Sequence, residues 1–378
     1  MKAKVYAIAT NITSALGLDT KAHWAAVSAG RVGVAEHTDA TYSNVPFWAS
    51  RIDAAMWQRI QAEVKSGQVL SPFEQLCVFS AKQALRSIEQ QLDAKDTIII
   101  LSTTKGNIEW LGQAADERLL LSTSANMIAK ELGYDMHKPM VISHACVSGV
   151  LATVYAQRML QAGRYKHAIV IGCDRFSKFV LNGFQSFHAI DHKACRPFDA
   201  ERHGINLGEA GATVILTTQP EETPLATILG GSSSNDANHI SGPSRTGEEL
   251  ALAINNALSE AGVQATDVNM VSAHGTATLY NDEMESKAIG VTGMQDVPLH
   301  SMKGYCGHTL GAAGVLESAM IIESLQHQQL IPSAGYENLG VPVAINVTTT
   351  QQPADIQYVL KMASGFGGSN ATAVWGRV

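Results

Sequence analysis

Residues 147–163, VSGVLATVYAQRMLQAG, are the stretch that decides the fold. They have the composition of a helix, yet they are apolar or small on nearly every side. A surface helix keeps one polar face, whereas a helix that is apolar all round is usually interior. A second segment of this kind, TLGAAGVLESAMIIESL, occupies residues 309–325. We therefore expect two buried helices whose small residues allow close approach to each other and to neighbouring sheets.

Short runs rich in β-branched residues lie on both sides of these helices in the chain. The predicted strands are residues 5–10, 97–102, 140–145, 167–173, 212–218, 225–231, 268–275, 344–349 and 357–364. Helical patterns, such as 73–92 and 247–262, separate many of them. Strands that alternate with helices are typical of α/β folds with covered sheets. Combined with two interior helices, this pattern predicts two sheets around a central helical layer, with a seam at Thr217–Pro224.

The composition excludes several classes of protein. The chain has 378 residues, of which 46% are hydrophobic and 16% charged, so it is too apolar for intrinsic disorder. A net charge of −7 argues against a nucleic-acid surface, which would need a basic stripe. No apolar stretch reaches the roughly 18 residues that a membrane span needs. The N-terminal segment reads as a first strand rather than a signal peptide.

The cysteines also indicate a class and a compartment. The chain has 5 cysteines, which are scattered and form no CxxC pair. This spacing argues against a zinc ribbon or a redox dithiol, and we predict no metal site. Free thiols fit the reducing cytoplasm, where we expect the protein to reside.

Cys146 stands where the run MVISHA ends and the first buried helix begins. At such a turn a thiol meets unpaired N–H groups and the positive end of the helix dipole, which lower its pKa. The same backbone amides can stabilise an oxyanion on an attacked carbonyl. The alternative is that Cys146 is a small buried hydrophobe, the usual state of a free cysteine. The position favours a nucleophile, with Cys306, between Lys303 and His308, as a competitor.

His274 ends the run VNMVSAHG and is followed closely by the hydroxyls of Thr276 and Thr278. A histidine at a strand end beside small residues is well placed to face a ligand, although a single histidine is as often structural. Asp282 and Glu285 follow with a spacing of three. This spacing predicts a capping box, with Asp282 as the N-cap of the next helix.

His308 directly precedes the second buried helix, as Cys146 precedes the first. The positive end of a helix dipole disfavours imidazolium, so we expect His308 to be neutral and able to donate a hydrogen bond. Glu317 lies inside the same helix, where a carboxylate needs a cation. Lys303 is the nearest candidate in the sequence.

Taken together, HACVSG, SAHGTAT, KGYCGHTLGAAGVLES and GFGGSNA resemble, in this order, the β-ketoacyl-acyl-carrier-protein synthases, condensing enzymes of the thiolase fold. Residues 196–212 and 232–240 (SSSNDANHI) match further signatures of that family. The chain looks most like the elongating Cys-His-His branch, because His308 stands where the initiating branch carries Asn. The resemblance implies a five-layer αβαβα fold of two similar halves, 1–217 and 218–378, each with a mixed sheet and a buried central helix.

The resemblance also implies roles for the residues that carry chemistry. Cys146 matches the nucleophile that accepts the acyl group. His274 and His308 match the paired histidines that donate hydrogen bonds to the enolate. Lys303 and Glu317 match the ion pair behind those histidines.

Five further positions match residues around the reaction centre. Phe366 matches the gating aromatic, whose N–H joins that of Cys146 in an oxyanion hole. Thr276 and Thr278 match the hydroxyls that hold the pantetheine arm. Asp282 and Glu285 match acidic residues near the site, so a capping role and a supporting role can coexist.

The implied activity is a decarboxylative condensation, in which a malonyl unit on acyl carrier protein extends a Cys-bound acyl group by two carbons. Such enzymes use no cofactor, since the phosphopantetheine arm of the carrier delivers the substrates. They act as homodimers, or as heterodimers with a related chain. Residues 174–191 resemble synthases of aryl-polyene or flexirubin-type pigment clusters, which implies a fatty-acid- or polyene-type chain.

Two alternatives remain at the level of the sequence. One is a non-catalytic partner of the chain-length-factor kind in a ketosynthase heterodimer. Such partners usually lose the nucleophile, whereas this chain retains Cys146. The other is an unrelated Cys-His hydrolase, which would release free acid without a condensation product.

Overall fold

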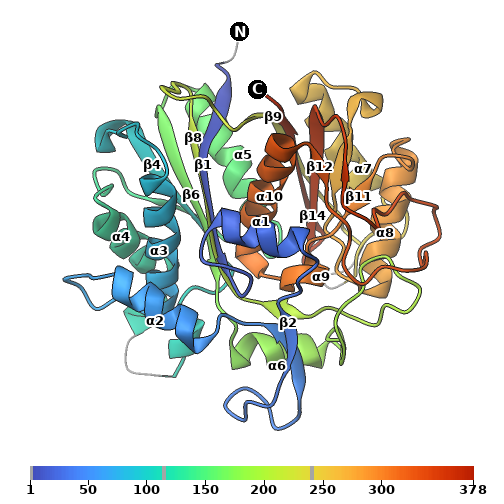
Figure 1. The fold of residues 1–378 in the computed structure, drawn as a ribbon, viewed down its shortest axis with the longest axis horizontal. Helices are drawn as coiled ribbons and strands as arrows, with labels where there is room; N and C mark the ends of the chain where they lie inside the picture. The colour runs from blue at the N-terminus through green and yellow to red at the C-terminus, as the bar shows by residue number, and fades with distance from the viewer. Residues whose placement is uncertain (1–2, 113–115, 239–241) are drawn as a thin grey trace.

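Two helices run side by side through the middle of the molecule. The computed structural model describes residues 3–112, 116–238 and 242–378, and in it α5 (Ser148–Gln161) and α10 (Ala313–His327) lie between two groups of strands (Figure 1). Most residues of both helices are buried. The two predicted interior helices are therefore confirmed.

The strands around these helices belong to one sheet, with the order β11-β10-β14-β15-β9-β1-β8-β6-β4-β5. One half of it consists of β1 (Val5–Ser14), β4 (Thr97–Ser102), β5 (Met140–Ile142), β6 (His167–Asp174) and β8 (Ala210–Thr217). The other half consists of β9 (Ala226–Asn235), β10 (Met270–Ser272), β11 (Leu299–His300), β14 (Tyr358–Gly365) and β15 (Ser369–Gly376).

Each half of the sheet is mixed. The pair β4–β6 is parallel and β6–β8 antiparallel in the first half, while β10–β14 is parallel and β14–β15 antiparallel in the second. The halves are joined where the start of β1 pairs with the start of β9, so the two sheets expected from the sequence are the two halves of one continuous sheet. The halves still enclose the central helices from opposite sides (Figure 1).

Further helices cover the outer faces and complete the layers. On the first half these are α2 (Ala54–Glu63), α3 (Pro72–Arg86) and α4 (Leu121–Leu132); on the second they are α7 (Glu248–Ala261) and α8 (Leu279–Val291) (Figure 1). The αβαβα order is therefore confirmed. None of the described helices is long and apolar enough to cross a bilayer.

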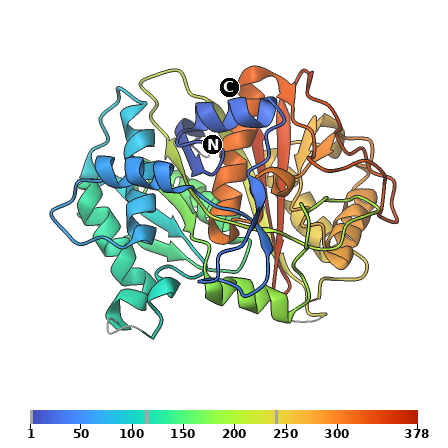
Figure 2. The same cartoon turned by 60° about the horizontal axis from the view of Figure 1, so that its bottom comes forward.

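Smaller elements close the ends of the layers. They are α1 (Thr20–Ser28), α6 (Lys178–Ser186), α9 (Lys303–Cys306), a small sheet of β2 (Val34–His37), β3 (Phe47–Ser50) and β7 (Leu207–Gly208), and the pair β12 (Gln329–Leu330) and β13 (Gln352–Pro353). Figure 2 shows α6 at the bottom of the molecule. Its buried Val180 and Leu181 pack in one apolar cluster with Leu310, which lies just before α10. The α6 helix therefore closes the end at which α10 begins.

The central helices touch through glycines near their N-terminal ends. A Cβ atom on Gly149 would lie 2.7 Å from the amide nitrogen of Val315, and one on Gly314 only 2.3 Å from that of Val150. Contacts that short are impossible for a side chain, so the two backbones themselves are in contact. Because both glycines are the second residues of their helices, the turns that precede α5 and α10 converge at one place.

Several local predictions are wrong. Residues 344–349 form no strand and contribute only the isolated bridge of Val347 to Leu299, because the segment runs along the sheet edge as a loop. The strand β15 was missed because its sequence, SNATAVWG, begins with polar and small residues. Of the stretch 232–240, His239 and Ile240 lie outside the described residues.

Candidate active site

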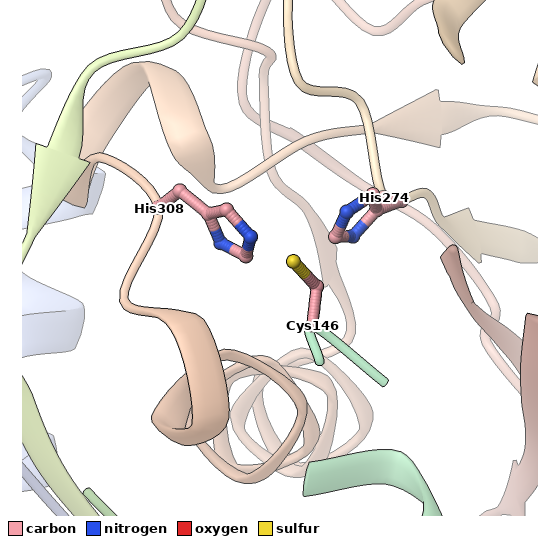
Figure 3. A group of neighbouring side chains, drawn as sticks. All are labelled: Cys146, His274 and His308. Carbon is pink, nitrogen blue, oxygen red and sulfur yellow. The ribbon is translucent and has the colours of Figure 1, made fainter. Parts of the chain in front are cut away.

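Three side chains from different parts of the chain meet where the two central helices begin. Cys146 comes from the turn before α5, His274 from the loop after β10, and His308 from the loop between α9 and α10. The sulfur and one nitrogen of each ring all lie within 4.8 Å of one another. In Figure 3 the sulfur points into the space between the two imidazoles. The rings meet edge to face, with centroids 5.2 Å apart.

The Cys146 turn is tight and buried. Ala145, just before it, has a φ of 45°, in the left-handed region that side chains rarely adopt. Burial raises the pKa of the Cys146 thiol to about 11, although the charges of Lys303 and Lys105 pull it down. The predicted lowering of the thiol pKa is therefore wrong, because desolvation outweighs the nearby cations. The thiol is protonated near neutral pH.

Cys306 is not a competing nucleophile at this site. Its side chain is buried in the central apolar cluster, and its sulfur contacts the carbonyl oxygen of Met302 at 3.3 Å. Burial raises the pKa of this thiol to about 12. It lines neither of the cavities that reach Cys146.

Both imidazoles are neutral, and each has at least one ring nitrogen without a hydrogen-bond partner among the described residues. Burial lowers the pKa of His274 and of His308 well below the usual value, and the Lys303 and Lys361 charges lower both further. The prediction that His308 is neutral is confirmed, with burial as the main cause. Among the described residues, Nδ1 of His274 and both ring nitrogens of His308 have no hydrogen-bond partner. A buried polar atom of this kind is available to a ligand.

Behind the histidines lies a buried ion cluster. Lys303 Nζ is 2.8 Å from Glu317 Oε1 and donates to the carbonyl oxygen of His274, so the predicted pair of Lys303 with Glu317 is confirmed. Lys361, on β14, lies 2.7 Å from the other oxygen of Glu317 and also donates to the carbonyl oxygens of Ser272 and Ala273. Two ammonium groups thus share one carboxylate and hold the chain that leads to His274.

Asp282 and Glu285 hold the same loop through its amides. Glu285 accepts hydrogen bonds from the N–H groups of His274 and Gly275. Asp282 accepts one from the N–H of Thr276. The predicted capping box is wrong, because α8 begins at Leu279 after an N-cap at Thr278, which places Asp282 inside the helix. Its carboxylate turns back to the loop, where it positions the site rather than the helix end.

The trio opens into a cavity of about 400 Å³ that is lined in part by Thr276 and Thr278. The two hydroxyls are 2.8 Å apart, within hydrogen-bond distance of each other. Phe366 borders the same cavity at the turn between β14 and β15. A Cβ on its neighbour Gly365 would lie 3.1 Å from the amide nitrogen of Cys146, so the two turns are in close contact.

Among the described residues, one group of three His, Cys or carboxylate side chains is compact enough to share a metal ion. It consists of Cys146, His274 and His308. Sulfur and imidazole nitrogen are zinc ligands. Here, however, the thiol is protonated, and a metal would have to displace that proton to bind.

Several residues around the site were missed at the level of the sequence. Lys361 interrupts an otherwise apolar strand, and a lysine in the middle of a buried strand is itself a signal of a buried ion pair. Phe184 and Phe187, from α6 and its C-cap, pack on Phe366 with ring centroids 5.6 and 5.4 Å from it. Only the tertiary structure places these rings beside the site.

Comparisons with known proteins agree with this geometry. The model of the β-ketoacyl synthase N-terminal domain matches residues 3–222, and that of the β-ketoacyl synthase C-terminal domain matches residues 225–337. The 3-oxoacyl-[acyl-carrier-protein] synthase 2 of Vibrio cholerae is 28% identical, with full coverage of both chains (100% each). That of Mycobacterium bovis is 30% identical over 67% of this chain and 65% of its own.

Solved structures give the same picture. A β-ketoacyl synthase from Burkholderia phymatum has a TM-score of 0.84 at 26% identity, over 100% of each chain. A ketosynthase in complex with its chain length factor from Xenorhabdus doucetiae has a TM-score of 0.85 at 25% identity, over 99% of this chain and 98% of that one. The ishigamide ketosynthase/chain length factor, at 23% identity and a TM-score of 0.89, covers 100% of both chains and shares the fold.

Proposed function

The chain belongs to the β-ketoacyl synthase family, and on that premise we propose that it condenses a malonyl unit with an acyl group held on Cys146. The observation that carries the proposal is a buried thiol within 4.8 Å of two imidazoles. Those imidazoles are neutral and have ring nitrogens left free for a ligand. In this proposal the acyl and malonyl groups arrive as thioesters on the phosphopantetheine thiol of acyl carrier protein, a protein that the names of the relatives include.

The first step transfers the acyl group to the enzyme. Cys146 Sγ attacks the carbonyl carbon of the acyl thioester, a new S–C bond forms, and the carrier thiol leaves with the thiol proton. Because the Cys146 thiol is protonated in the empty site, one of the neutral imidazoles takes that proton during the attack. The N–H groups of Cys146 and Phe366 stabilise the oxyanion, a role supported by the close contact of their two turns.

The second step generates the carbon nucleophile. The bond between the malonyl carboxylate and its α-carbon breaks, CO₂ leaves, and the electron pair passes into an enolate. Neutral His274 and His308 donate hydrogen bonds to the enolate oxygen, which is the use their free ring nitrogens support. The cluster of Lys303, Glu317 and Lys361 holds the loop of His274 in place. Neutral donors suit this step, because imidazolium would protonate the carbanion.

The third step joins the two units. The α-carbon attacks the Cys146 thioester carbonyl, a C–C bond forms, and the Cys146 sulfur leaves and regains a proton. The product is a β-ketoacyl thioester two carbons longer than the acyl group. The carrier thiol left with the original Cys146 proton and the malonyl carboxylate brings none, so the proton that Cys146 regains comes from solvent. No oxidation or reduction occurs, and the proposed chemistry requires no metal or dissociable cofactor.

The proposal extends to the binding partners of the chain and to its cellular compartment. The carrier arm enters the larger cavity past Thr276 and Thr278, whose hydroxyls supply hydrogen bonds to its amides. We place the chain in a dimer, either with itself or with a related chain, as in the solved ketosynthase in complex with a chain length factor. Its five free, buried cysteines suit the reducing cytoplasm.

Product formation tests the proposal. The purified chain, alone and with any synthase-like chain that co-purifies, is offered acyl and malonyl carrier protein, and product masses are read. We expect a β-ketoacyl carrier two carbons longer, lost in Cys146→Ala and kept in Cys306→Ala. Steady release of free acid would indicate a hydrolase instead. A product that survives Cys146→Ala in the mixed complex would assign this chain the chain-length-factor role.

A further inference from the structure

A second cavity reaches Cys146 from another side. Its volume is about 210 Å³, and it shares the walls Cys146, Phe184, Phe187 and Phe366 with the larger cavity. The aromatic cluster of Phe184, Phe187 and Phe366 therefore stands between the two spaces. Phe179 adds another ring to the smaller one. An acyl group on the Cys146 sulfur can extend into this second space while the larger cavity stays open to the carrier arm.

One charged side chain lines this mostly apolar cavity. Among its described lining residues, Lys105 alone carries a charge, and it follows the apolar strand β4 on the loop that begins at Thr103. Its charge acts at the Cys146 sulfur, where it lowers the thiol pKa against the effect of burial. Lys105 and the sulfur to which the acyl chain would be attached thus line the same cavity.

The Lys105 ammonium is poorly satisfied by the protein. Its Nζ makes one hydrogen bond, a long one of 3.4 Å, to the carbonyl oxygen of Thr104. Within the described part of the chain, no carboxylate oxygen lies within 4.0 Å of it. An ammonium has three donors, so two or more of them depend on water or a ligand.

An acyl chain that enters the cavity would replace the water that hydrogen-bonds to the Lys105 ammonium, and the chemistry of the chain decides whether those hydrogen bonds are restored. A saturated alkyl chain would remove water from the ammonium and return no acceptor, which is unfavourable for a charged group. A chain with a carbonyl, carboxylate or other acceptor oxygen would restore the hydrogen bond, and bonds to charged groups are the stronger ones. The phenylalanine rings meanwhile pack on the apolar part of the same chain.

We propose that Lys105 is a specificity residue, which selects acyl groups with an apolar body and a hydrogen-bond acceptor oxygen on the part that enters the second cavity. The inference rests on the proposed function, because it requires an acyl group on Cys146. It assigns the substrate class as oxygen-bearing acyl chains rather than plain alkyl chains. Keto and carboxylate groups share the chemistry that Lys105 recognises.

Three acyl donors of nearly one shape separate these possibilities. The 5-methylhexanoyl, 5-oxohexanoyl and glutaryl groups end in two methyls, a ketone and a carboxylate, respectively, at the same carbon. Each is supplied as the N-acetylcysteamine thioester, and the rate of Cys146 acylation is followed by intact-protein mass spectrometry. For the wild-type protein we expect the two oxygen-bearing groups to react about tenfold faster or more than the alkyl one.

Variants at Lys105 assign the preference to its charge. Lys105→Met keeps the length of the side chain and removes the charge, so the tenfold preference should vanish or reverse. Lys105→Arg keeps the charge and should keep the preference. Lys105 is only partly buried, and an unchanged thermal melting curve verifies that both variants fold. A faster glutaryl than 5-oxohexanoyl rate would specify an anion, and equal rates a neutral acceptor; both support the inference.

Two other results have distinct meanings. An equal preference in wild-type and Lys105→Met proteins, or a wild-type preference for the alkyl group, would overturn the role of Lys105 and leave the condensation intact. The proposed function would be overturned instead if neither the three thioesters nor acyl-loaded carrier protein transferred an acyl group to Cys146. The Cys146→Ala variant, which must show no adduct, verifies the site of labelling.

Discussion

The two cavities that meet at Cys146 differ in the chemistry of their walls. The larger adds imidazoles, hydroxyls and amide groups, among them His274, His308 and Thr276, to the phenylalanine rings that both cavities share. The smaller is lined by phenylalanine rings and Lys105. Under the proposed function one sulfur serves two tasks: bonds are made and broken on the polar side, and the acyl chain lies on the aromatic side. Damage to one side should therefore leave the task of the other largely intact.

The two sides also differ in what lies behind them. Charged groups support the polar side from within the core. Lys303 and Lys361 share Glu317 and donate to the carbonyl oxygens of residues 272–274. Burial is the main cause that keeps the imidazoles neutral, and these charges lower the pKa of both histidines further without touching the reacting atoms. The site is therefore uncharged where bonds change and charged one layer further back.

The largest expected effect concerns the thiol that both cavities share. Because burial raises the pKa of Cys146 to about 11, its thiolate fraction and its alkylation by iodoacetamide should rise as pH rises towards that value. The rate should increase about tenfold per pH unit, hence about a thousandfold between pH 7 and pH 10. Cys146→Ala supplies the background. A rate that is already level above pH 7 would contradict the protonated thiol and indicate a thiolate–imidazolium pair.

The next effect separates the two sides directly. His274→Ala and His308→Ala each remove one donor to the enolate, which should slow malonyl decarboxylation about 10²- to 10³-fold. Acylation of Cys146 by a thioester, followed by mass, should fall far less, because the remaining imidazole can still take the thiol proton. Equal losses in both assays would show that the histidines serve the thiol rather than the enolate.

The pH dependence of decarboxylation gives an independent view of the same groups. The pKa of each histidine is well below its usual value, so both stay neutral from pH 8 down to pH 6. The rate should be level over that interval and fall only as pH drops through the lowered pKa values. A fall centred near the ordinary histidine pKa of about 6.5 would contradict their burial.

A smaller effect concerns the ion cluster behind the polar side. Lys361→Met would leave a buried carboxylate with one cation and three carbonyl groups without their donor, which should destabilise the fold by about 3 kcal/mol. The control is Lys95→Met, which breaks an exposed pair with Asp93 and should leave the free energy of unfolding nearly unchanged. Urea unfolding measures both. Equal values would mean that Lys361 is not a buried structural cation.

The smallest effect concerns the carrier arm. Thr276→Val removes a hydroxyl from the larger cavity and keeps the shape of the side chain. The loss of one neutral hydrogen bond should raise the KM for malonyl carrier protein about threefold to tenfold, with little change in kcat. A fall in kcat at constant KM would place the hydroxyl in the chemical steps instead.

Much of this arrangement could be predicted from the sequence because local patterns encode it. The apolar helices, the residues Cys146 and His308 before them, and the pair of Lys303 with Glu317 all follow from neighbours along the chain. The protonation state of the Cys146 thiol could not be predicted in this way. A strand-to-helix turn indicates a lowered thiol pKa, but burial raises that pKa instead, and only the tertiary structure fixes the depth of burial.

Other features depend on contacts between distant segments. Phe184 reaches Phe366 only after α6 has packed beneath the central helices, and the carboxylate of Asp282 turns back to Thr276 rather than capping α8. Lys105 and Lys361 are ordinary lysines by composition. The phenylalanine-lined cavity beside Lys105 is recorded by no local pattern. The interruption of an apolar strand by Lys361 indicates a buried ion pair, but it does not identify Glu317 as the partner.

The most direct measurement is a single-turnover experiment on the sulfur itself. The protein is loaded with an acyl thioester, digested, and mapped by mass, and a second aliquot receives malonyl carrier protein before digestion. We expect the acyl group on the peptide that contains Cys146, and its quantitative loss into a β-ketoacyl carrier when malonyl carrier protein is added. An acyl group found elsewhere, or an adduct on Cys146 that malonyl carrier protein leaves unchanged, would contradict the assignment of this thiol as the nucleophile.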